Sequence, residues 1–157
     1  MATTSYRVER STIVDAPPEA VYPHLADFRR WTSWSPWEGV DPTMTRTYSG
    51  ADAGAGAVYA WTGNRKAGAG RMTITEVTPP WRVAVDLRFD KPFRSRSETV
   101  FTVEPAGAGC RVTWTMTGPM SVGTRLMSLV KSMDALIGPD FEKGLAHLKL
   151  TAETTRG

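Results

Sequence analysis

Two stretches of the chain place apolar residues at every second position, the pattern of a β-strand with one covered face. They are Trp81–Phe89 and Cys110–Gly118. The apolar members are Trp81, Val83, Val85, Leu87 and Phe89 in the first stretch, and Val112, Trp114 and Met116 in the second. Because side chains alternate between the two faces of a strand, each set lines a single face. The chain therefore folds around a sheet with one face covered by other elements and the other face exposed to solvent.

The C-terminal region supplies the cover that this sheet requires. Large apolar residues recur there at helical spacing, at Met133, Ile137, Phe141, Leu145 and Leu148. Two helical segments, Thr124–Ile137 and Asp140–Glu153, meet at Pro139. A proline inside a helix kinks it or begins a new one. One face continues across this junction, so we predict a single kinked helix packed on the sheet.

The remaining elements are predicted from periodicity and from Gly and Pro breaks. We expect short helices at Pro18–Ala26, with Asp15 as N-cap, and at Phe28–Trp34. The expected strands are Tyr6–Val14, Thr43–Tyr48, Ala57–Trp61, Gly70–Thr78, Trp81–Phe89, Arg96–Glu104 and Cys110–Gly118. The breaks between successive strands from residue 43 onward are too short for parallel crossovers. The prediction is an α+β fold with an antiparallel sheet of about seven strands, forming one domain over residues 1–157.

Composition narrows the function classes. The net charge is only +3, and the basic residues are scattered rather than striped with aromatics, which argues against nucleic acid as a partner. The single Cys110 cannot form an internal disulfide, and the start of the chain has no signal-like apolar region, so we expect a cytoplasmic protein. No apolar run suits a membrane helix. No His/Cys/Asp cluster has metal-ligand spacing, so we expect no metal ion and no cofactor. We expect the protein to be a monomer or a homodimer.

Four segments carry a resemblance to a known superfamily. They are Val14–Tyr22 (VDAPPEAVY), Trp31–Trp37 (WTSWSPW), Gly63–Met72 (GNRKAGAGRM) and Gly138–Leu145 (GPDFEKGL). Together with the element order, they resemble the START and pollen-allergen superfamily (SRPBCC), and within it the bacterial polyketide cyclase/dehydrase-type branch. The resemblance implies a helix-grip fold, in which a curved sheet wraps a long C-terminal helix. It also implies a cavity for a lipid, a sterol or an aromatic polyketide-like molecule.

The candidate ligand contacts are large apolar residues at predicted inward positions, in the cluster Trp31–Trp37, and at the rim beside Arg94 and Arg96. They are Trp34, Trp37, Trp61, Met72, Leu87, Phe89, Phe93, Trp114, Met116, Met133, Ile137 and Phe141. Indole rings and flexible thioethers suit a hydrophobic ligand, although the same side chains also fill ordinary cores. We expect Trp114 to line a cavity, because more bulk converges on the closing helix than one helix can cover.

Residues suited to acid–base chemistry are few. The candidates are Asp134, near the inner edge of the closing helix, and His24 on the first helix. Catalysis needs such a group placed against the substrate, and the inward positions are nearly all apolar. We therefore favour a carrier of a hydrophobic small molecule over a cyclase or dehydratase acting on a poly-β-keto chain. A third hypothesis is a protein-interaction or chaperone-cofactor-like module, which would expose an apolar patch.

Overall fold

The computed structural model describes residues 5–36, 43–64, 68–91, 94–119 and 133–154 of the chain. Its elements are β1 (Ser5–Val14), α1 (Pro18–Ala26), η1 (Phe28–Ser33), β2 (Thr45–Gly50), β3 (Ala57–Thr62), β4 (Ala69–Thr78), β5 (Arg82–Lys91), β6 (Ser95–Ala106), β7 (Gly109–Pro119) and α3 (Met133–Thr154). Each strand and both short helices predicted from the sequence are present, with ends that differ by at most two residues. The segment η1 is a 3-10 helix.

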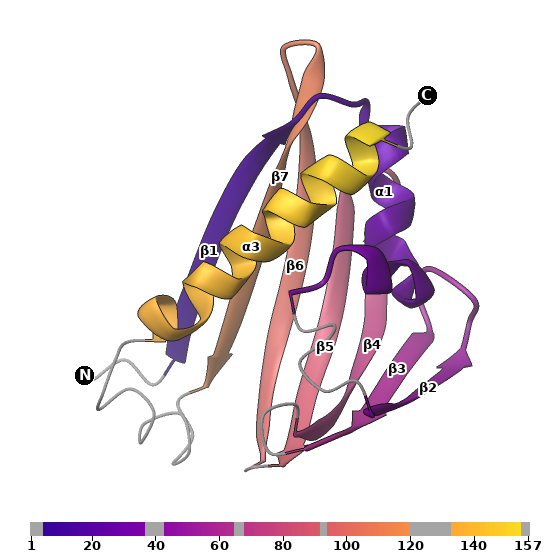
Figure 1. Cartoon of the computed structure of the whole chain (residues 1–157), viewed down its shortest axis with the longest axis vertical. Helices are drawn as coiled ribbons and strands as arrows, with labels where there is room; N and C mark the ends of the chain where they lie inside the picture. The colour runs from indigo at the N-terminus through magenta and orange to yellow at the C-terminus, as the bar shows by residue number, and fades with distance from the viewer. Residues whose placement is uncertain (1–4, 37–42, 65–67, 92–93, 120–132, 155–157) are drawn as a thin grey trace.

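The sheet has seven strands in the order β1-β7-β6-β5-β4-β3-β2. Every neighbouring pair is antiparallel. A bulge between Ile74 and Glu76 shifts the register of β4 against β5, and such an extra residue bends a strand. The sheet is curved, and α3 crosses its concave face diagonally in front of β1, β7 and β6, while α1 lies near its C-terminal end (Figure 1).

The closing helix continues through Pro139 as one element, as predicted. Its buried hydrophobic side chains are Phe141, Leu145, Leu148 and Ala152, and Ile137 is partly buried against the same core. The side chain of Met133 and the predicted helical residues 124–132 lie outside the described part of the chain.

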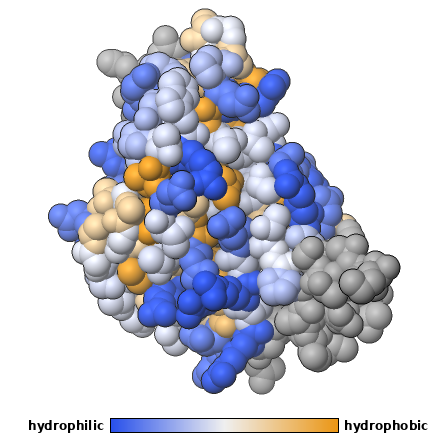
Figure 2. Space-filling model, turned by 180° about the vertical axis from the view of Figure 1, so that it is seen from behind, coloured by the Kyte–Doolittle hydropathy of each residue, from blue (hydrophilic) through white to orange (hydrophobic). Residues whose placement is uncertain are grey.

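The opposite, convex face of the sheet is exposed to solvent. Hydrophilic side chains are interspersed there with small apolar areas (Figure 2). Asp86 of β5 forms ion pairs with Arg88 at 3.0 Å and with Arg96 of β6 at 2.9 Å. Charged side chains of the sheet thus alternate with buried apolar ones, as period-two patterning predicts.

Two local predictions were wrong. Trp81 is 42% exposed, because β5 begins at Arg82 and Trp81 belongs to the preceding turn rather than to the covered face. Asp15 does not cap α1, whose N-cap is Pro17 with no side-chain hydrogen bond. The backbone N–H of Asp15 instead donates to Glu153 Oε2 at 2.7 Å, which ties the start of α1 to the end of α3.

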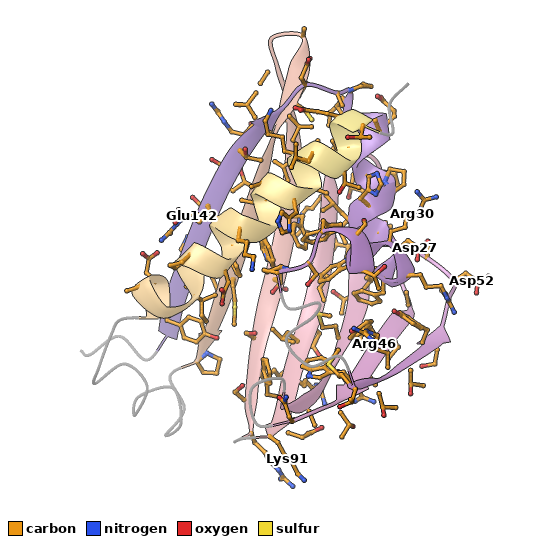
Figure 3. All side chains as sticks on the ribbon, in the orientation of Figure 1. Asp27, Arg30, Arg46, Asp52, Lys91 and Glu142 are labelled. Atoms are coloured by element: carbon orange, nitrogen blue, oxygen red, sulfur yellow. The ribbon has the colours of Figure 1, made fainter. Side chains whose placement is uncertain are left out.

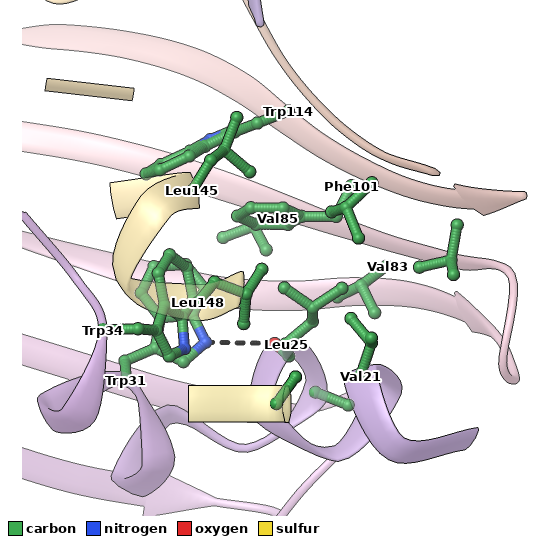
Figure 4. Packing of buried hydrophobic residues seen from close by; sticks show 14 of the residues in the cluster. Val21, Leu25, Trp31, Trp34, Val83, Val85, Phe101, Trp114, Leu145 and Leu148 are labelled. Atoms are coloured by element: carbon green, nitrogen blue, oxygen red, sulfur yellow. Dashed lines mark hydrogen bonds between the residues drawn. The ribbon is translucent and has the colours of Figure 1, made fainter. Parts of the chain in front are cut away.

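An aromatic cluster fills the interior where α1, η1 and α3 meet the sheet (Figure 4). The indole N–H of Trp34 donates to the carbonyl of His24 at 2.9 Å, and that of Trp31 donates to the carbonyl of Leu25 at 3.0 Å. Both rings contact Phe101 edge to face, with centroids 5.8 and 5.7 Å away. Buried indoles whose N–H groups are satisfied make a tightly packed core. The architecture is the helix-grip fold.

Candidate ligand site on the concave face

The strand register arranges the concave-face side chains in rows across the sheet. The row beneath the aromatic cluster is Val83, Phe101 and Trp114. The next row is Ile74, Val85, Thr99 and Met116. The third is Tyr48, Tyr59, Met72, Leu87 and Ser97. The fourth is Arg46, Trp61, Gly70, Phe89 and Ser95.

Burial decreases from the first row to the fourth. Val83 and Phe101 are completely buried, and Leu87 of the third row is 8% exposed. Trp61 and Phe89 of the fourth row are only partly buried. The first row lies under the aromatic cluster, whereas the fourth lies toward the β3–β4 and β5–β6 connections. The concave face is therefore packed at one end and has accessible apolar side chains at the other.

Aromatic rings form most of this accessible end. The rings of Trp61 and Phe89 meet edge to face with centroids 5.4 Å apart, and Tyr59 lies 6.0 Å from Trp61. Between them on β4 is Gly70, where a Cβ atom would come within 2.9 Å of Trp61 Cη2. The absence of a side chain at Gly70 lets the indole lie across that strand. The result is a broad apolar floor of the kind that binds flat or aliphatic molecules.

A pair of hydroxyl groups provides polar character on the same face. The side chain of Tyr6 on β1 is hydrogen-bonded to Ser97 on β6, and burial raises the pKa of the Tyr6 hydroxyl. The two strands are separated by β7, where a Cβ atom on Gly118 would be 2.9 Å from the Tyr6 oxygen. Thr99 is also buried on this face. These neutral groups can donate and accept hydrogen bonds without placing a charge on the floor.

Five of the predicted ligand contacts lie in the three rows beyond the aromatic cluster. They are Trp61, Met72, Leu87, Phe89 and Met116. Met72 and Leu87 are paired directly across β4 and β5, and Ile137 approaches from α3 with its side chain partly buried. Trp37 and Phe93 lie outside the described residues, as does the side chain of Met133.

Trp34, Trp114 and Phe141 belong instead to the packed end. The ring of Trp114 is stacked on Phe141 with centroids 4.0 Å apart and an interplanar angle of 7°. Trp34 meets Trp114 edge to face at 5.6 Å. Trp114 is 1% exposed. The expectation that Trp114 lines an open space therefore does not match this packing, because partners from η1 and α3 enclose the ring.

The two candidate proton-transfer residues lie away from the floor. Asp134, in the first turn of α3, has a side chain that is 53% exposed, and it forms an ion pair with Arg10 of β1 at 2.8 Å. Hydrogen bonding to Arg10 lowers the pKa of Asp134. His24 is buried beside the aromatic cluster, and burial, with a smaller contribution from the charge of Arg30, lowers the pKa of its imidazole.

The residues of this face that escaped the sequence analysis include Tyr6, Arg46, Tyr59 and Ser97. Ser97 could have been found by alternation, since it is two residues before Thr99 in the strand predicted at Arg96–Glu104, and both are buried. Arg46 gave no signal, because the short strand β2 has too few apolar residues to fix its phase. Tyr6 could be placed on a strand, but its hydrogen bond to Ser97 depends on the strand order.

Comparison with known proteins assigns the chain to a family and to a fold. A family model described as "Polyketide cyclase / dehydrase and lipid transport" matches residues 5–153. No protein of curated function is significantly similar in sequence. In the described residues, no helix is long and apolar enough to cross a membrane, and no group of three or more His, Cys, Asp or Glu side chains is placed to hold a metal ion.

Solved structures share the architecture at low sequence identity. A protein from Chromobacterium violaceum is 18% identical with a TM-score of 0.65, covering 96% of this chain and 97% of its own. The Aha1 dimer from Colwellia psychrerythraea is 17% identical with a TM-score of 0.63, over 97% and 99% of the two chains. Ara h 8.0201 is 10% identical with a TM-score of 0.62, over 96% of both chains. At these identities the similarity establishes the fold alone.

Proposed function

The chain belongs to the polyketide cyclase / dehydrase and lipid transport family, and on that premise we propose that it binds a hydrophobic small molecule on the concave face of its sheet. The site consists of Trp61, Met72, Leu87 and Phe89, with the Tyr6–Ser97 hydroxyl pair beside them. The ligand class is a lipid, a sterol or an aromatic polyketide-like molecule.

The observation that carries this proposal is the decrease in burial along the concave face. A sheet that served only to build a core would bury its apolar residues throughout. Here Trp61, Phe89 and Met72 remain partly accessible on the covered face, while their neighbours toward the aromatic cluster are buried. A buried aromatic side chain removes about 150–250 Å² of surface from water, so covering two such rings with a ligand is strongly favourable. The methionine adapts to ligands of different shape.

The positions of the acid–base candidates favour a carrier over a cyclase or dehydratase. Removing a proton α to a carbonyl requires a base within hydrogen-bond reach of the substrate carbon. Asp134 is exposed and paired with Arg10, and His24 lies behind the aromatic cluster. Tyr6 and Ser97, which lie beside the floor, are neutral hydroxyls that suit orientation of a ligand.

Binding of N-phenyl-1-naphthylamine, a neutral apolar dye whose fluorescence rises in apolar surroundings, tests the proposal. We expect saturable binding by the parent protein and at least about a tenfold loss of affinity in Trp61→Ala, the amount that corresponds to about 1.4 kcal/mol. Trp81→Ala is the matched control, because Trp81 is a partly exposed indole in a turn outside the site. That variant should bind as the parent does.

Native mass spectrometry of the purified protein provides an independent readout, since a retained small molecule would appear as a defined mass increment. Absence of dye binding by the correctly folded parent, or equal loss in Trp61→Ala and Trp81→Ala, would contradict the proposed site.

A further inference from the structure

We infer that the ligand carries an anionic end, such as a carboxylate, and that Arg46 binds it at the β2 edge of the concave face. This inference rests on the proposed function and specifies the chemistry of its ligand. It makes the site selective for a hydrophobic acid over a neutral molecule with the same apolar body.

Arg46 is placed by the register on the same face as the apolar floor. It pairs with Trp61 of β3, which pairs with Gly70 of β4, which pairs with Phe89 of β5. Its side chain is half-buried and lies over the β2–β4 side of the sheet, away from α3 (Figure 3). A guanidinium at one end of a row of aromatic rings forms, with them, a surface that is charged at one end and apolar along its length.

The charge distribution over the sheet favours an anion at this end. The acidic residues of β4, β5 and β6 next to the floor, Glu76, Asp86 and Glu98, occupy convex-face positions of the register. No concave-face position of the described strands carries an acidic residue. Lys91, which is exposed at the end of β5, adds a second positive charge on the open side (Figure 3).

A second arginine of the concave face shows how a guanidinium of this sheet binds carboxylates. Arg10 on β1 donates two hydrogen bonds to Asp134, at 2.8 and 2.9 Å, and a third to Glu142 at 2.9 Å. Both carboxylates come from α3, which covers that side of the sheet. Arg46 lies on the side of the sheet that α3 does not cover.

The geometry of the two partners is complementary. A guanidinium has five N–H donors in a planar fork, so it can hold a carboxylate through two parallel hydrogen bonds in addition to a contact within the protein. From β2 to β5 the row spans three strand spacings, about 14 Å. An acyl chain held by its carboxylate at Arg46 can therefore extend over Trp61 toward Phe89.

A pair of ligands that differ only in charge tests this inference. Dodecanoate and 1-dodecanol have the same chain, and each is titrated, below its aggregation concentration, against protein loaded with N-phenyl-1-naphthylamine. We expect the parent to bind dodecanoate about tenfold or more tightly than the alcohol. A charge-assisted hydrogen bond in a half-buried site contributes a free energy of binding of this size. Lowering the pH below the pKa of the fatty acid should remove that preference.

The variant Arg46→Gln should lose the preference for dodecanoate and keep its affinity for 1-dodecanol, whereas Arg46→Lys should retain part of the preference. The matched control is Arg71→Gln, which removes the same charge from the convex face of β4, next to Gly70. It should bind both ligands as the parent does.

Each outcome separates this inference from the proposed function. Equal affinity of the parent for the two ligands would overturn the role of Arg46 and leave the apolar site intact. A preference that survives in Arg46→Gln, or is lost equally in Arg71→Gln, would also overturn it. Failure of the folded parent to bind the dye and both ligands would overturn the proposed function itself. The comparison within the parent protein decides the question even if Arg46→Gln does not fold.

Discussion

Replacing Gly144 with alanine tests how tightly the closing helix is packed on the sheet. Glycine inside a helix costs about 1 kcal/mol relative to alanine, so on propensity alone the substitution should stabilise the protein. A Cβ atom at this position, however, would lie 2.8 Å from Pro36 Cδ and 2.9 Å from Trp114 Cζ3. Ordinary contacts begin at 3.4 Å, so both neighbours would have to move by several tenths of an ångström.

Neither neighbour can move freely. Pro36 is a buried ring, and Trp114 is held by its stacking on Phe141 and by its edge-to-face contact with Trp34. Overpacking of such a site typically costs about 1–3 kcal/mol. Two rigid contacts place this site in the upper part of that range, so after subtraction of the propensity gain we expect a net destabilisation of about 1–2 kcal/mol.

Urea unfolding at equilibrium and thermal melting measure this effect, with Tm falling by about 2–4 °C for each kcal/mol in a chain of this size. Gly138→Ala in the same helix is the contrasting variant. The added Cβ atom there would meet the guanidinium of Arg10, the end of a flexible side chain that can shift by loosening its ion pairs with the exposed Asp134 and Glu142. Its melting temperature should change less. A Gly144→Ala protein as stable as the parent, or more stable, would refute the packing argument.

Three further predictions follow from burial. Trp114→Ala should lower the free energy of unfolding by about 3–5 kcal/mol in urea titrations, because the ring is enclosed; a loss below about 1 kcal/mol would mean that the ring lines an open space. The pKa of His24 is lowered below its ordinary value of 6.5, so the unfolded chain binds more protons below that pH. The parent should therefore lose stability as the pH falls from 6.5 toward the lower folded pKa, and His24→Gln should lose less. The pKa of Tyr6 is raised above 10.0, so stability should fall as the pH rises above 10.0 in the parent; an equal fall in Tyr6→Phe would contradict this.

Much of the fold was predictable from the sequence because the relevant signals are local. Alternation in Trp81–Phe89 and Cys110–Gly118 phased β5 and β7 correctly from Val83 onward, since side-chain direction in a strand repeats every two residues. The stripe through Phe141, Leu145 and Leu148 identified the buried face of α3 in the same way. Trp81 shows the limit of this reasoning, because one residue at the end of a pattern belongs to the turn when the strand starts later.

The candidate site was only partly predictable. Period-two patterning correctly placed Trp61, Met72, Leu87 and Phe89 on one face. It also predicted Trp114 as a ligand contact, although the ring of Trp114 is enclosed by other side chains. The difference depends on which distant segments cover each residue, and η1 and α3 reach one end of the face only.

The sequence by itself determined which elements form and which side of each well-patterned strand is covered, because those properties depend on the spacing of neighbouring residues. Only the tertiary structure decided where the covered face is packed and where it is accessible. It also placed Arg46 in line with Trp61 and Phe89 and brought Tyr6 to Ser97 across β7. These arrangements depend on strand order and register, and they join residues far apart in the chain that no local pattern connects.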